Sequence, residues 1–119
     1  MRYVGWIIRE SLSDPSFLDG LKVLKLEVSK EELPLTLSGE ERGRWHMYKV
    51  EVTEEDIKEL QRIILPDWYA HFWGDDELIV VYSGRVFRCS KSDRSTWREA
   101  IEYGLSTGIP REELDFLID

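Results

Sequence analysis

The sequence predicts an α+β fold, with a mainly antiparallel sheet of five to six strands and two principal helices on one face. Three observations predict it. Residues 68–89 read as three consecutive strands joined by tight turns, residues 22–29 alternate between apolar and polar side chains, and residues 53–65 and 96–106 have apolar side chains at helical spacing. We expect one domain, residues 1–119, because 42% of the residues are hydrophobic and can fill a core.

The chain opens with a predicted strand and a short helix. Residues 3–10 are apolar on both faces, which is typical of a strand that is covered or central. Asp14, Pro15 and Gly20 fit the cap, the first position and the exit of a helix.

Two strands and the first principal helix follow. The strands are predicted at residues 22–29 and 44–52, and the polar stretch between them, residues 30–43, reads as a long loop. Thr53 is suited to cap a helix that has acidic residues in its first turn and ends at Pro66.

The three-stranded segment and a second helix complete the chain. Gly74-Asp75-Asp76 and Ser83-Gly84 are predicted to connect the strands of residues 68–89. Thr96 and Glu99 fit a capping box for the second helix. The order of elements from residue 3 to residue 73 is also that of a ferredoxin-like core.

Composition and charge limit the classes of function. The net charge of −8 argues against nucleic-acid binding, because phosphate contacts need basic side chains. The chain has one cysteine, no signal-peptide pattern and no apolar run long enough to span a membrane, so we expect a cytoplasmic protein. A charged fraction of 34%, no Asn and one Gln favour a thermophilic source.

Three segments, Trp68-Tyr69-Ala70-His71-Phe72-Trp73, Ser95 to Gly104 and Leu114-Asp115-Phe116, resemble a family of small prokaryotic proteins of unknown function. The similarity extends over most of the chain. It implies a prokaryotic, soluble, single-domain protein, and it implies no catalytic residues.

Aromatic density is the main functional signal. The candidate ligand-binding residues gather around the aromatic strand and include two arginines from a locally basic stretch: Trp45, His46, Trp68, Tyr69, His71, Trp73, Arg85 and Arg88. Tryptophan and tyrosine offer rigid apolar area with a polar tip, so these residues suit a non-enzymatic binding or regulatory module with a protein partner or small ligand. The same residues also fit a packed sheet with a hydrogen-bonded histidine, or a homodimer interface.

A second interpretation is a small metal-dependent hydrolase or phosphoesterase. If their strands were adjacent, His46 and His71 would converge with Asp75 on a metal ion, and Arg85 or Arg88 would clamp an anion. No ligand-spacing motif supports this interpretation, so we predict no cofactor and no metal site. Cys89 is expected to be a buried, inert thiol rather than a nucleophile.

Overall fold

The computed structural model describes residues 2–28, 46–66, 68–109, 111 and 114. Its elements, with η marking 3₁₀ helices, are β1 (Arg2–Ile8), η1 (Arg9–Ser11), η2 (Pro15–Gly20), β2 (Lys22–Val28), β3 (His46–Thr53), α1 (Glu54–Ile63), β4 (Tyr69–Gly74), β5 (Glu77–Tyr82), β6 (Arg85–Ser90), η3 (Arg94–Trp97) and α2 (Arg98–Ser106). The predicted α+β class is confirmed. The loop predicted at residues 30–43 and the candidate ligand-binding residue Trp45 lie outside the described residues.

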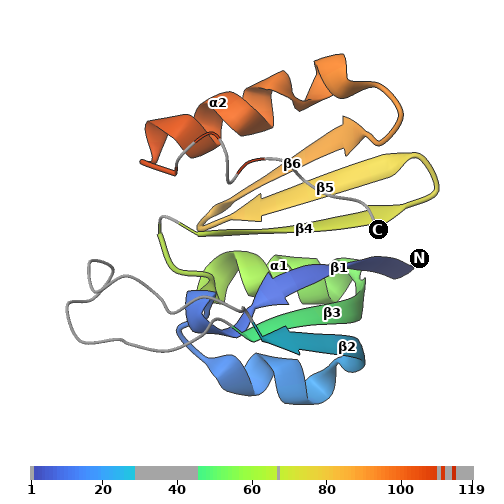
Figure 1. Ribbon diagram of the computed structural model, residues 1–119, viewed down its shortest axis with the longest axis vertical. Helices are drawn as coiled ribbons and strands as arrows, with labels where there is room; N and C mark the ends of the chain where they lie inside the picture. Colours follow the sequence, from blue (N-terminus) through green and yellow to red (C-terminus); the bar gives the residue numbers. More distant parts are fainter. Residues whose placement is uncertain (1, 29–45, 67, 110, 112–113, 115–119) are drawn as a thin grey trace.

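The six strands form one sheet in the order β2-β3-β1-β4-β5-β6, and every neighbouring pair is antiparallel (Figure 1). The first four strands have the order of a ferredoxin-like core, in which β1 and β2 lie on either side of β3. In place of that core's first helix the chain has the short segments η1 and η2. Strands β5 and β6 extend the sheet beyond β4.

The two principal helices lie on opposite faces of the sheet, so the prediction that they share one face is wrong. α1 buries Ile57 and Leu60 in a cluster with Ile79 and Val81 of β5. α2 instead buries Ala100 in a cluster with the alternate β5 residues, Leu78, Val80 and Tyr82. All five residues 78–82 are buried, because β5 is covered on both sides.

Local sequence explains how the elements begin and turn. Thr53 caps α1, as predicted, and together with Asp56 it forms a capping box. The β5–β6 turn is Ser83-Gly84, and Gly84 has the positive φ of 75° that a tight hairpin needs. The capping box predicted at Thr96 is wrong, because the Asp93 side chain caps the preceding η3 and the Thr96 hydroxyl accepts a bond from the Ser90 N–H of β6.

Gly5 allows β1 and β4 to meet. A Cβ at this position would overlap the His71 carbonyl oxygen and the Phe72 ring, so only glycine lets the Phe72 side chain lie across β1.

No helix within the described residues is long and apolar enough to cross a membrane.

Candidate binding surface

One row of rings follows β4 on the face opposite α1. Tyr69, His71 and Trp73 alternate along the strand, with ring centroids 6.1 Å apart for Tyr69 and His71 and 5.8 Å apart for His71 and Trp73. The Tyr69 end of the row packs on the cluster that α2 forms, where its ring lies 6.0 Å from that of Tyr82. The row also extends sideways onto β1, because Trp6 is paired with His71, the middle member of the row, in the sheet.

The aromatic row ends at a lysine that lies over two indoles. Lys49 is the β3 partner of Trp6, and its Nζ is 5.9 Å from the ring centroids of both Trp6 and Trp73. Each distance is within the range of a cation–π interaction. We call Trp6, Lys49, Tyr69, His71 and Trp73 the β4 aromatic row.

Most of this row lies beyond the area that the helices cover. Trp6 and Trp73 belong to neither of the two hydrophobic clusters, and both remain partly exposed. His71 between them is 8% exposed and engages in interactions with its surroundings. The row is therefore a half-buried aromatic platform with a positive charge at one end.

The surroundings of the row are locally positive. On the same face, β1, β2 and β3 place four basic side chains, Arg2, Lys22, Lys25 and Lys49, and two acidic ones, Glu27 and Glu51. The difference is 4 − 2 = +2, in a chain whose net charge is −8. Arg2 and Lys22 both pair with Glu51, and Lys25 pairs with Glu27, so among the described residues both acids of this area are already engaged.

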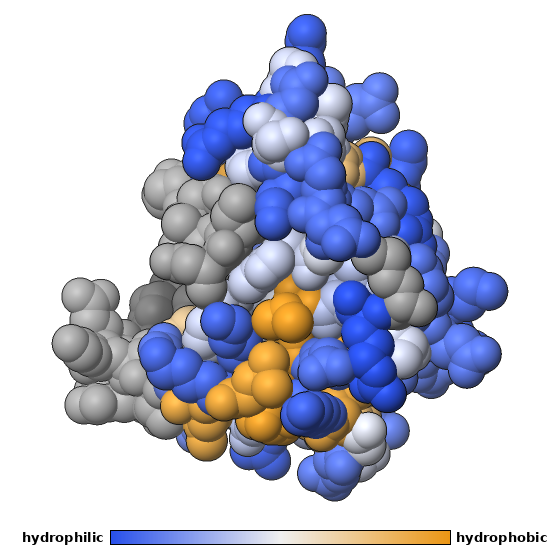
Figure 2. Space-filling view, turned by 90° about the vertical axis from the view of Figure 1, so that its right-hand side faces the viewer, coloured by the Kyte–Doolittle hydropathy of each residue, from blue (hydrophilic) through white to orange (hydrophobic). Residues whose placement is uncertain are grey.

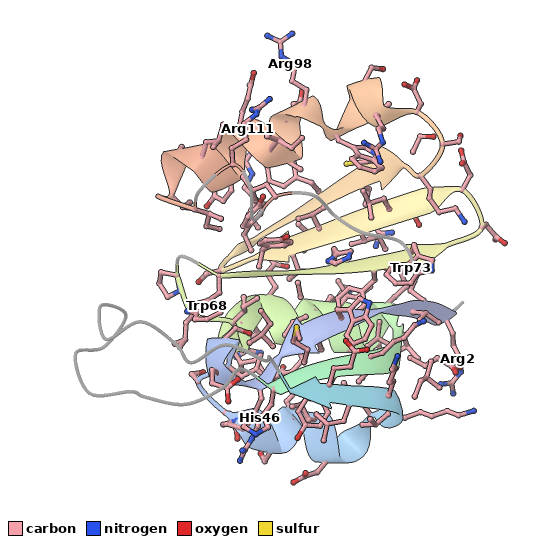
Figure 3. All side chains as sticks on the ribbon, viewed as in Figure 1. Arg2, His46, Trp68, Trp73, Arg98 and Arg111 are labelled. Atoms are coloured by element: carbon pink, nitrogen blue, oxygen red, sulfur yellow. The ribbon has the colours of Figure 1, made fainter. Side chains whose placement is uncertain are left out.

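Trp68 lies away from the row, near the opposite end of β4 from Trp73 (Figure 3). It packs against the cluster on the α1 face and also lines a cavity of about 290 Å³. The other residues that line this cavity are Pro66, Tyr82, Ser83, Tyr103 and Thr107. Trp68 and Tyr69 are both candidate binding residues, but Trp68 precedes β4 and packs on the α1 side, whereas Tyr69 packs on the α2 side.

His46 and His71 do not converge. His46 shares the face of Tyr48 and Val50, which is the α1 face, whereas His71 shares the face of Lys49. The His46 side chain bonds Glu10, with 2.8 Å between Nδ1 and Oε2, and its backbone N–H donates to Glu10 Oε1. No three metal-ligating side chains gather within the part of the chain that the structure describes. The convergence of His46 and His71 on which the hydrolase interpretation depends is therefore contradicted.

Arg88 is held in a network on the α1 face. It pairs with Glu54 at the start of α1 and with Glu77, at 3.1 Å, at the start of β5. The Tyr3 hydroxyl, which has a single proton to donate, lies 2.9 Å from an oxygen of each carboxylate. Hydrogen bonds from Arg88 and Tyr3 lower the pKa of Glu54, and burial with these carboxylates raises the pKa of Tyr3 to about 12. Arg88 therefore joins three elements and has its charge compensated.

The basic stretch of residues 85–98 does not form one anion patch. Arg85 lies on the opposite face from Arg88, and its guanidinium stacks over the rings of Phe87 and Tyr103 at 5.0 and 5.2 Å. Arg94 stacks on Trp97 at 4.9 Å, and Arg98 pairs with Glu102. The alternation of a strand thus separates charges that are close in sequence.

Cys89 is buried on the α2 face, as predicted, and burial raises the pKa of its thiol.

Sequence reasoning missed Trp6 and Lys49 as members of the row. The signal for Trp6 was present in the alternation of Val4, Trp6 and Ile8 on one face of a strand with two apolar faces. Lys49 had no such signal, because its place beside two indoles depends on which strands become neighbours.

No family model, no curated protein and no solved structure matches this chain. The resemblance to a prokaryotic family accordingly stays a prediction.

Proposed function

We propose that the protein is a non-enzymatic binding module that holds an acidic, aromatic-containing peptide segment of a partner protein on the β4 aromatic row. The observation that supports it is Lys49 lying over Trp6 and Trp73 on a part of the sheet outside both helix clusters. Indole rings offer area for stacking an apolar or aromatic side chain, and the ammonium group attracts a carboxylate beside it.

The partner's charge follows from the surroundings of the row. The local excess of two positive charges favours an anionic segment, and the chain's overall charge of −8 repels the dense phosphates of nucleic acid. An acidic peptide carries isolated carboxylates between apolar side chains, so it can reach Lys49 without bringing a continuous line of charge against the rest of the protein.

The first test is a titration followed by NMR of the five tryptophan indole N–H groups and the His71 imidazole. The probe is a peptide in which Asp alternates with Phe. We expect it to shift the Trp6, Trp73 and His71 signals and to leave the Trp97 indole unchanged, because Trp97 is buried at the start of α2 and donates to the Ser90 carbonyl.

Charge reversal supplies the matched comparison. Lys49→Glu is expected to weaken the peptide's binding by about tenfold or more, since it turns an attraction of about 1 kcal/mol into a repulsion. Lys58→Glu makes the same change on an exposed position of α1, on the other face, and should leave binding within about twofold. Equal effects of the two variants, or no shift at Trp6 and Trp73, would overturn the proposal. A larger response to a single-stranded oligonucleotide would replace the proposed class of partner.

A further inference from the structure

β2 is an edge strand with an unusually apolar, exposed surface. It stands at one end of the sheet order, and its side chains Val23, Leu24 and Leu26 are 43%, 44% and 50% exposed. Figure 2 shows the right-hand side of the view in Figure 1. Apolar side chains gather in its lower half, which is the half in which β2 lies in Figure 1. An exposed edge of this kind offers unpaired N–H and C=O groups to another strand.

The C-terminal part of β2 is regular enough to pair with such a strand. Its pairing with β3 shifts between Val23 and Lys25, and beyond that bulge Lys25 to Val28 follow one continuous register. A bulge hinders pairing with another strand only where it bends the edge. The residues of β2 after the bulge therefore remain available for pairing.

We propose that β2 pairs with β2 of a second copy of this chain, antiparallel about a two-fold axis at Leu26. If the two-fold axis is perpendicular to the sheet, residues that lie directly across from each other in the two strands have their side chains on the same face. The register then sets Leu26 across from Leu26 of the second copy. It also sets Lys25 against Glu27 twice, once on each side of the axis. The edge is thus self-complementary in charge, with one leucine facing its own copy at the axis.

Neighbouring registers lack this complementarity. A two-fold axis at Lys25 would set the two Lys25 side chains opposite each other, and an axis at Glu27 would set the two Glu27 side chains opposite each other. Like charges directly across a strand pair are destabilising. The charges therefore select the register centred on Leu26, where each Lys25, already 2.8 Å from Glu27 of its own strand, gains a second carboxylate.

The pairing would join two six-stranded sheets into one of twelve strands. Lys25 and Lys49 share a face, so both β4 aromatic rows would lie on the same side of the joined sheet. The inference does not depend on what the rows bind. Because each copy contributes only part of one edge strand, the dimer is expected to be weak and concentration-dependent.

Sedimentation equilibrium tests the dimer. The wild-type mass should rise with concentration from 14.1 kDa toward twice that value. Lys25→Glu and Glu27→Lys alone should each remain monomeric, because each sets like charges opposite one another. The double variant, which carries Lys25→Glu together with Glu27→Lys, should dimerise again. Lys58→Glu, a charge reversal on α1, should dimerise like the wild type.

Mixing the two single variants tests whether the dimer depends on ion pairs between the chains or on the Lys25–Glu27 ion pair within one strand. The Lys25→Glu chain carries two acidic side chains at the paired positions and the Glu27→Lys chain carries two lysines there. Opposite charges would therefore meet on both sides of the axis, so the mixture should form a heterodimer although neither chain regains a Lys–Glu contact within its own strand. A mixture that stays monomeric, single variants that dimerise as well as the wild type, or a wild-type mass fixed at 14.1 kDa at every concentration would each overturn the proposal.

Discussion

At the scale of single residues, the structure depends on side chains whose role comes from a distant partner. Gly5 is defined by the Phe72 ring that lies across it, and Tyr3 by carboxylates from α1 and β5. Neither role can be predicted from neighbouring residues in sequence. What sequence does predict is the residue type that a strand or helix favours, so it locates the elements along the chain without locating their contacts.

Gly5→Ala should destabilise the protein by about 3 kcal/mol or more, because the added Cβ overlaps backbone and ring atoms of a neighbouring strand that cannot move aside. Urea unfolding measures the change in free energy. Gly20→Ala is the matched control, since a Cβ at position 20 meets nothing within 4 Å. A loss of stability for Gly5→Ala no larger than for Gly20→Ala would contradict the close contact between β1 and β4.

Tyr3→Phe should lower stability at neutral pH by about 1.5 kcal/mol, because it removes a hydrogen bond to charged partners. The folded pKa of Tyr3, about 12, is higher than the ordinary value of about 10. The contribution is therefore complete below about pH 10 and is lost as the pH rises through about 12.

Urea unfolding of the wild type and Tyr3→Phe across this range checks the sign. The difference between them should shrink as the pH rises from about 10 to about 12. The Tyr82 phenol, whose burial also raises its pKa, is present in both proteins and so cancels in the comparison. A difference that grows with pH would show that the Tyr3 phenol is not held neutral by its neighbours.

At the scale of elements, prediction succeeded for the strands and helices and failed for how they face one another. The two-residue alternation of side chains shows which residues of a strand point to the same side. It does not show which of the two faces of the sheet this side belongs to. For this reason the sequence predicts strands at both His46 and His71, but only the register shows that their side chains lie on opposite faces of the sheet. The opposite placement of α1 and α2 had one readable sign, the unbroken apolar run Leu78 to Val81, which is typical of a strand covered on both sides.

The start of the α2 segment also makes a prediction. Asp93 accepts hydrogen bonds from the backbone N–H of Ser95, at 3.0 Å, and from its hydroxyl, at 2.6 Å. Asp93→Ala should therefore lower stability by about 1 kcal/mol, and Asp93→Asn, which keeps the accepting oxygen, should retain most of it. Thermal unfolding measures both variants. If Asn were as damaging as Ala, the cap would not be the source of the effect.

At the scale of the whole molecule, the sheet is covered unevenly. Strand β5 is buried on both faces, whereas β2 ends the sheet with most of its side chains exposed. The free energy needed to open a segment rises with the buried contacts that opening breaks. Amide hydrogen exchange on dilute protein should therefore be slowest at Ile79, Val80 and Val81 and fastest, among the strands, in β2. Equal protection of β2 and β5 in dilute protein would contradict this gradient.

Concentration adds a second condition to the same measurement. If β2 pairs with itself, the N–H groups of Lys25 to Glu27 that point outward gain acceptors in the dimer, while β5 gains nothing. Raising the protein concentration should then slow exchange in β2 selectively. The Lys25→Glu variant should show the dilute pattern at every concentration, because it lacks the opposite charges that set the register. A general slowing across all strands would instead indicate global stabilisation, which edge pairing at β2 does not explain.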